Sequence, residues 1–149
     1  MMPDTHTTRR FELAEGEHAV ALSKLVTPNG VRLLVESGAD SARLDALALE
    51  TLTWQDDAFF ADLTGQPHEE GTETDAGEPL QVSNEYTTVV LRPLETTAGP
   101  RLAVRSQKMD YECRLSPAEL AALARERIDF FSELLATPLG PESDHQHIV

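Results

Sequence analysis

Apolar and polar residues alternate in two well-separated parts of the chain, with the period of two that is typical of half-buried strands. The stretches GVRLLVES (30–37) and GPRLAVRS (99–106) place leucine and valine on one face and arginine on the other. Each follows a turn that ends in glycine and an earlier alternating stretch, AVALSKLV or TVVLRPLE. Shorter stretches complete four strands in each half: RFELAEG and SARL in the first, LQVSNEY and YECRL in the second. We therefore expect two antiparallel four-stranded sheets.

A helical period follows the strands in both halves. Ser116, Pro117 and Glu119 have the order of a capping box with proline at the first helical position, and Asp45 takes the N-cap place in the first half. The pattern predicts one helix after each sheet, with its apolar stripe on one face of that sheet. The apolar positions at helical spacing are Leu49, Leu52, Phe59 and Leu63, then Leu120, Leu123, Phe130 and Leu134.

The two halves also match each other residue by residue. With an offset of 69, nine of the 27 positions in 11–37 are identical to those in 80–106. With an offset of 71, seven of the 21 positions in 43–63 are identical to those in 114–134. The offset changes between strand and helix, where a turn tolerates an insertion. We infer a duplicated ββββα unit.

The expected fold class is thus α+β, with two tandem ββββα repeats that each form a sheet backed by a helix. The first repeat is expected at 10–64 and the second at 79–140. Residues 65–78 between them are rich in acids and are expected to form a flexible linker. The tails 1–9 and 141–149 are expected to be disordered.

Composition and charge narrow the class of protein. The chain has 149 residues, 40% of them hydrophobic, which is enough for a core. No apolar run is long enough for a membrane span, and the start has no signal-peptide pattern, so a cytoplasmic protein is expected. The 26 acidic residues outnumber the 12 basic ones, for a net charge of −14, and only two of the basic residues are lysines. This acidity resembles that of halophilic proteins. The single cysteine, Cys113, gives no disulfide framework and no zinc pattern.

Eight of the basic residues lie in the strands or their turns, while the acids concentrate in helices, linker and tails. If the helices cover one face of each sheet, Arg32, Arg101 and Arg105 lie on the open face. One interpretation is a groove for single-stranded nucleic acid. The other is that these arginines are solvated and pair with nearby glutamates. The residues expected to bind nucleic acid are Lys24, Arg32, Arg92, Arg101, Arg105, Lys108 and Tyr111.

The strand-to-helix stretch CRLSPAEL with Phe130–Phe131, mirrored by ARLDALAL with Phe59–Phe60, resembles the PUR-repeat and Whirly proteins. Their fold is shared by small transcription coactivators that bind single-stranded DNA. The resemblance implies that the two units pack as an intramolecular pseudo-dimer, with helices crossing the partner sheet. It also implies that the curved sheets bind DNA or RNA.

No catalytic motif is present, so we expect no enzyme, and no cofactor or metal site is expected from the scattered histidines. The alternative to nucleic-acid binding is a protein-interaction or regulatory module that uses the same sheet or the region of Trp54. Trp54 itself is expected either in the core or exposed to a partner. Pairing of two chains into a homodimer is left open.

Overall fold

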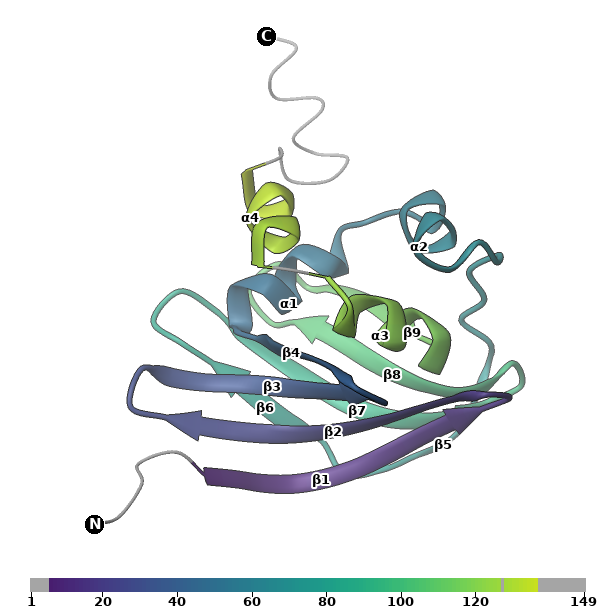
Figure 1. Cartoon of the computed structure of the whole chain (residues 1–149), viewed down its shortest axis with the longest axis horizontal. Coiled ribbons are helices and arrows are strands. Elements are labelled where there is room, and N and C mark those ends of the chain that lie inside the picture. The colour runs from purple at the N-terminus through teal and green to yellow at the C-terminus, as the bar shows by residue number, and fades with distance from the viewer. Residues whose placement is uncertain (1–5, 127, 137–149) are drawn as a thin grey trace, which may run out of the picture.

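A computed structural model describes residues 6–126 and 128–136 (Figure 1). The first half forms a four-stranded antiparallel sheet in the order β1-β2-β3-β4. Leu22 pairs with Val35 across β2 and β3, and Leu33 pairs with Leu44 across β3 and β4. These apolar pairs share one face of the sheet, as the alternation predicts. The strands are β1 (His6–Glu15), β2 (His18–Thr27), β3 (Gly30–Ser37) and β4 (Asp40–Leu44).

The second half forms a five-stranded antiparallel sheet, ordered β5-β7-β8-β9 with β6 also paired to β7. Leu91, Val104 and Cys113 form a row across β7, β8 and β9 on the buried face. The expected mixed α+β class with two antiparallel sheets is confirmed. The strands are β5 (Glu73–Ala76), β6 (Leu80–Ser83), β7 (Thr88–Thr96), β8 (Gly99–Ser106) and β9 (Tyr111–Leu115).

Within the described residues, four helices replace the two that were predicted: α1 (Ala46–Thr53), α2 (Asp57–Thr64), α3 (Pro117–Ala124) and α4 (Ile128–Ala136). The break in the first half has a local cause, because the Asp56 side chain accepts from the Phe59 backbone N–H at 2.9 Å and so caps a new helix. The predicted capping box of α3 is confirmed, with Ser116 and Glu119 bonded reciprocally. No helix in the described part of the chain is long and apolar enough to span a membrane.

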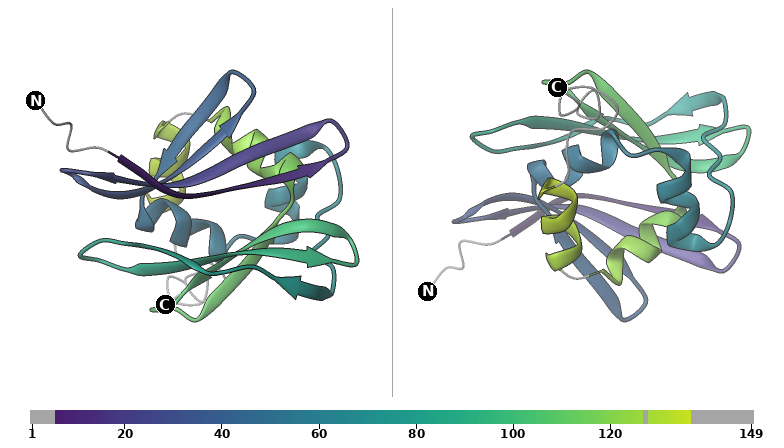
Figure 2. Two further views of the ribbon diagram at one scale, coloured as in Figure 1. Left: turned by 90° about the horizontal axis from the view of Figure 1, so that it is seen from below. Right: turned by 90° about the horizontal axis from the view of Figure 1, so that it is seen from above.

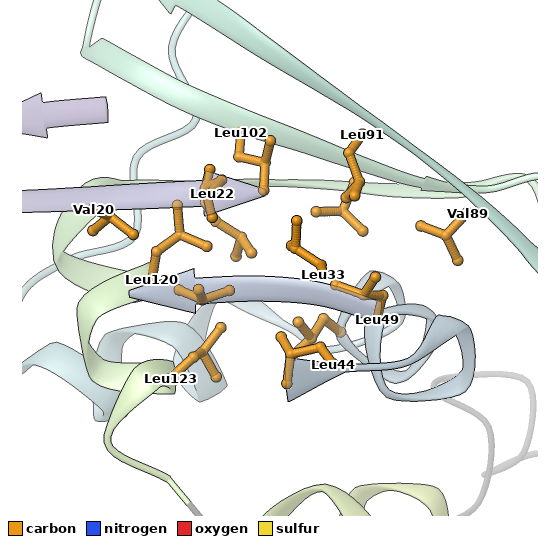
Figure 3. Close-up of a cluster of buried hydrophobic side chains, with 14 of the residues drawn as sticks. Val20, Leu22, Leu33, Leu44, Leu49, Val89, Leu91, Leu102, Leu120 and Leu123 are labelled. Atoms are coloured by element: carbon orange, nitrogen blue, oxygen red, sulfur yellow. The ribbon is translucent and has the colours of Figure 1, made fainter. Parts of the chain in front are cut away.

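The helices exchange sheets, which corrects the expectation from their apolar stripes that each covers its own sheet and agrees with the crossing that the resemblance implies. Helix α1 packs on β7, β8 and β9, and α3 packs on β2 and β3. Figure 2 shows both helices between the two sheets. Leucines and valines from both sheets and both helices form one core (Figure 3). Trp54 is also buried, so its exposure to a partner is excluded.

Residues 65–78 are not the free linker that their composition suggested. Within them, β5 pairs with β7, and the Thr72 carbonyl accepts from the Thr97 backbone N–H at 2.9 Å. The acidic side chains of this segment are mostly exposed, so pairing of its backbone does not bury their charge. At the N-terminus, β1 begins at His6, inside the tail expected to be disordered, whereas 141–149 lie outside the described residues.

Candidate functional site

The basic residues expected to form one surface lie in several places. Arg92 and Arg105 occupy the outer face of the second sheet, whereas Arg32 belongs to the first sheet. Lys24 lies opposite Leu33 in the pairing of β2 with β3. Its side chain is therefore on the core side of β2, where it is half-buried. Tyr111 pairs with Ser106 and is likewise on the core side of β9. Lys108 is exposed in the turn between β8 and β9.

Arg101 is on the outer face but is only 3% exposed. Its Nε donates to the Glu69 carbonyl at 2.7 Å, and its Nη1 donates to Glu15 Oε1 at 3.1 Å. Two further bonds go to the carbonyls of Pro100 and Ala98. The guanidinium is thus used within the protein, and the expectation that Arg101 offers it to a nucleic acid is wrong.

The segment that covers Arg101 also engages the other arginines of this face. We call residues 68–73 the strap. Arg92 and Arg114 lie in one row across the sheet with Ala103 between them, and both have an Nη2 3.5 Å from Oε1 of Glu73. Arg114 also donates to the Gly71 carbonyl at 3.2 Å. At the other end of the face, Arg105 pairs with Asp110 at 2.5 Å. Each outer-face arginine of the second sheet therefore has an acidic partner.

His68 fastens the strap to the helices. Its side chain is 1% exposed, with Nδ1 2.6 Å from Glu119 Oε2 and Nε2 3.0 Å from Glu70 Oε2. The ring stacks on Phe60 of α2 at 4.7 Å. Burial favours the neutral imidazole, but the two carboxylates outweigh it and raise the pKa of His68. His68 thus joins α2, α3 and the strap, and these contacts favour its imidazolium form.

A buried cysteine, Cys113, lies next to this cluster. Burial together with nearby carboxylates raises the pKa of the thiol well above its usual value. The thiol therefore stays protonated and closed to solvent. Within residues 6–126 and 128–136, no group of three or more histidine, cysteine or acidic side chains is arranged to hold a metal ion.

A groove of about 560 Å³ lies between β4 and α4. We call it the β4–α4 groove. Leu47 and Ala48 of α1 and Phe131 of α4 line it, and Leu135, which also lines it, is 48% exposed. Strand β4 is at the edge of its sheet.

Local structure positions the walls of this groove. The Asp45 carboxylate caps α1 by accepting from the Ala48 backbone N–H at 2.8 Å, so the chain turns sharply from β4 into α1. Phe59 of α2 and Phe130 of α4 lie with ring centroids 5.9 Å apart, which ties α4 to the preceding helices. The groove is therefore built on regular elements.

Arg32 and Arg43 provide the cationic wall of the groove. Among the described residues, Arg32 donates only to the carbonyls of Val31 and Asn29. Arg43 has no hydrogen bond or ion pair in the part of the chain that the structure describes. Neither guanidinium has a carboxylate partner there, in contrast to the arginines of the second sheet. From the sequence, Arg32 was named as a candidate but assigned to a face that binds nucleic acid. The groove was not predicted, because one helix was expected where the structure has α3 and α4.

The sequence matches no protein-family model, and no curated protein matches it significantly.

Proposed function

We propose that the protein is a non-enzymatic binding module whose β4–α4 groove takes an extended acidic segment of a protein partner. The observation that supports this is the pair Arg32 and Arg43, which lies beside apolar side chains and has no ion pair among the described residues, although Asp45 and Glu126 also line the groove. In a chain of net charge −14, long-range repulsion would oppose an acidic partner. At molar salt the screening length falls to about 3 Å, so contacts between neighbouring charges decide the affinity.

The chemistry of the partner follows from a second proposal, that the two halves are tandem copies of one unit packed as a pseudo-dimer, in the manner of PUR-repeat and Whirly proteins. Element bounds support it: β3 and β8 differ by 69 at both ends, and α1 and α3 differ by 71. The turns support it as well. Thr27 Oγ1 donates to the Gly30 carbonyl at 2.8 Å, and Thr96 Oγ1 donates to that of Gly99 at 2.8 Å.

Under these offsets the strap fills the counterpart of the β4–α4 groove. Arg101, Arg114 and Phe60 correspond to Arg32, Arg43 and Phe131, which line the groove. At the second sheet, Arg101, Arg114 and Phe60 of α2 contact the strap through the Glu69 carbonyl, the Glu73 carboxylate and the His68 ring. The strap is an acidic, non-helical piece of chain with a left-handed residue at Gly71, and an acidic, non-helical partner segment suits the groove.

One position must differ between the strap and such a partner. Glu119, which binds His68, corresponds to Ala48 in the groove. An imidazolium beside alanine would lose its counterion on burial. We therefore expect the partner to carry an apolar residue at the place that His68 has in the strap.

Single-stranded nucleic acid on the outer face of the second sheet is the alternative proposal. It is favoured by Arg92, Arg105 and Arg114, which share that face. Their acidic partners weigh against it, because a phosphate would have to displace Glu73 and Asp110.

Fluorescence polarisation tests the groove with a labelled peptide, QPLEEGTE, which is the sequence of residues 66–73 with leucine in place of histidine. We expect saturable binding that Arg43→Glu weakens about tenfold, a loss near 1.4 kcal/mol. The matched control is Arg105→Glu, on the other sheet, which should bind as the wild type does. The peptide QPHEEGTE should bind more weakly than the leucine version.

The same titration uses a second protein in which residues 137–149 are replaced by a Gly-Ser segment of equal length, so that the C-terminal sequence cannot compete. Failure of both proteins to bind the peptide at low and at molar salt would refute the groove proposal. Binding of a labelled single-stranded oligonucleotide that disappears in Arg92→Glu would favour the alternative instead.

A further inference from the structure

We propose that the β4–α4 groove is occupied in the free protein by the chain's own C-terminal segment, residues 137–144, which a partner has to displace. The displacement rests on the proposed function, whereas the docking of the segment stands on its own evidence. The occupant is inferred from the strap, which shows how a segment that follows a helix fills the equivalent site in the second half.

The strap reaches its site directly from α2. Gly65, with φ of 75°, ends that helix, and three residues later the His68 ring lies against Phe60 and Glu119. Glu69 then meets Arg101 through its carbonyl, and Glu73 meets Arg114 through its carboxylate. A helix, a short turn and the six non-helical residues 68–73, with a left-handed residue at Gly71, are thus sufficient to fill the site.

The same order recurs at the C-terminus. Helix α4 ends at Ala136, which is the counterpart of Gly65 under the offset of 71, and thirteen residues follow it in the sequence. Pro138 corresponds to Pro67 in the turn. Asp144 corresponds to Glu73, so an acid again falls at the place where the strap meets its arginine. The chain therefore has a segment of suitable length that begins beside the groove.

The strongest support for docking is that two residues in contact in the strap site both differ at the corresponding positions of the groove and the C-terminal segment. His68 corresponds to Leu139, and the residue that His68 contacts, Glu119, corresponds to Ala48. An ion pair in one half is thus matched by two apolar residues in the other, while the aromatic neighbour is phenylalanine in both, Phe60 and Phe131. Leu139 is the residue type that Ala48 and Phe131 would accommodate, because neither offers a partner for a charge.

Docking would also account for two features of the groove. Leu135 is a large apolar side chain that is 48% exposed at its edge, and a docked segment would cover it. Arg43 has no ion pair within the described residues, and Asp144 would supply the carboxylate that Glu73 supplies to Arg114.

Photo-crosslinking on the full chain tests the docking. With p-benzoylphenylalanine in place of Leu139, we expect crosslinks to Leu47 and Phe131 that mass spectrometry locates within one chain. The matched control places the same group at Ile148, beyond the docked residues, and should give no preferred crosslink. Equal mixtures of ¹⁴N- and ¹⁵N-labelled protein separate crosslinks within a chain from those between chains. Crosslinks between copies, or none to the groove, overturn the proposal.

A double-mutant cycle provides a second measurement that does not need the probe. Ala48→Glu and Leu139→His together recreate the pair of the second half in the groove. We expect each single variant to lower Tm, and the double variant to melt on the order of 2–4 °C above the additive value, as about 1 kcal/mol of coupling predicts. Strict additivity overturns the docking.

The peptide titration then separates the two proposals. If the segment competes, the protein with residues 137–149 replaced binds QPLEEGTE about tenfold more tightly than the wild type. If crosslinks form but no peptide binds, the docking of residues 137–144 is supported and the proposal of a protein partner is refuted. If both proteins bind the peptide equally and no crosslinks form, the proposal of a protein partner is supported and the docking of residues 137–144 is refuted.

Discussion

Arg32 and Arg101 each bind the preceding residue of their own strand and a residue of the turn before it. Arg32 donates to the carbonyls of Val31 and Asn29 at 3.3 and 3.5 Å, and Arg101 donates to those of Pro100 and Ala98 at 2.7 and 3.2 Å. An arginine after the turn glycine thus has a structural use in both hairpins. Only Arg101 adds a carboxylate and the strap to these bonds, so the two residues differ in burial and in what they stabilise.

The first prediction follows from that difference. Arg101→Ala removes a buried guanidinium and leaves the Glu69 carbonyl without its donor, so the free energy of unfolding should fall by about 2–4 kcal/mol. Arg32→Ala removes only two long bonds to carbonyls and should cost less than about 1 kcal/mol. Urea denaturation followed by circular dichroism measures both. Equal losses in the two variants would contradict the roles given to them.

The second prediction concerns pH. Because the pKa of His68 is raised in the folded state, its ion pairs contribute fully below the unfolded value of about 6.5. The contribution is lost as pH rises through the folded pKa, so the urea midpoint of the wild type should fall over that range. His68→Gln should have a lower midpoint in mildly acidic solution and a flatter pH dependence.

The control for this experiment is Thr64→Ala at the end of α2, which removes a hydroxyl bonded to the Gln66 carbonyl and no titratable group. It should keep the pH dependence of the wild type. If His68→Gln keeps that dependence too, the imidazolium does not fasten the strap.

A third prediction concerns a buried carboxylate on α1. Glu50 is 4% exposed, and its Oε1 accepts hydrogen bonds from the hydroxyls of Thr87 and Ser106, the latter at 2.7 Å. Glu50→Ala leaves two buried hydroxyls without an acceptor and should cost about 2–4 kcal/mol. Glu50→Gln keeps a carbonyl oxygen in place and should cost clearly less. Thermal denaturation ranks the variants, and equal Tm values for them would show that the hydroxyl contacts contribute nothing.

The sheets could be predicted from the sequence because they depend on local alternation. Leu33 and Val35 in β3, and Leu102 and Val104 in β8, are buried as the period of two requires. The capping box at Ser116 and Glu119 was equally readable, since its residues are three apart.

The features that the residue pattern alone missed depend on contacts between distant residues. The exchange of α1 and α3 between the sheets cannot be read from the apolar stripe of either helix, because leucines on both sheets present the same kind of surface. The strap has the composition of a linker, and only the bonds of Glu69 to Arg101 and of His68 to Glu119 give it a fixed place. The orientation of Arg101 was read correctly, but its burial follows from those long-range contacts.

The last prediction tests whether the outer face of the second sheet can bind an anion at all. Glu73 is 34% exposed and lies 3.5 Å from both Arg92 and Arg114. Partly exposed pairs of this length contribute little, so Glu73→Ala should change the free energy of unfolding by at most about 1 kcal/mol.

The same change leaves two arginines without a carboxylate on this face. If the face binds nucleic acid, affinity for a single-stranded oligonucleotide should rise in Glu73→Ala and fall with added salt. Polarisation titrations at several salt concentrations measure this, with Glu95→Ala on β7 as the matched loss of one acid. Equal, negligible binding by all three proteins would leave Glu73 with a structural role and would count against a nucleic-acid ligand.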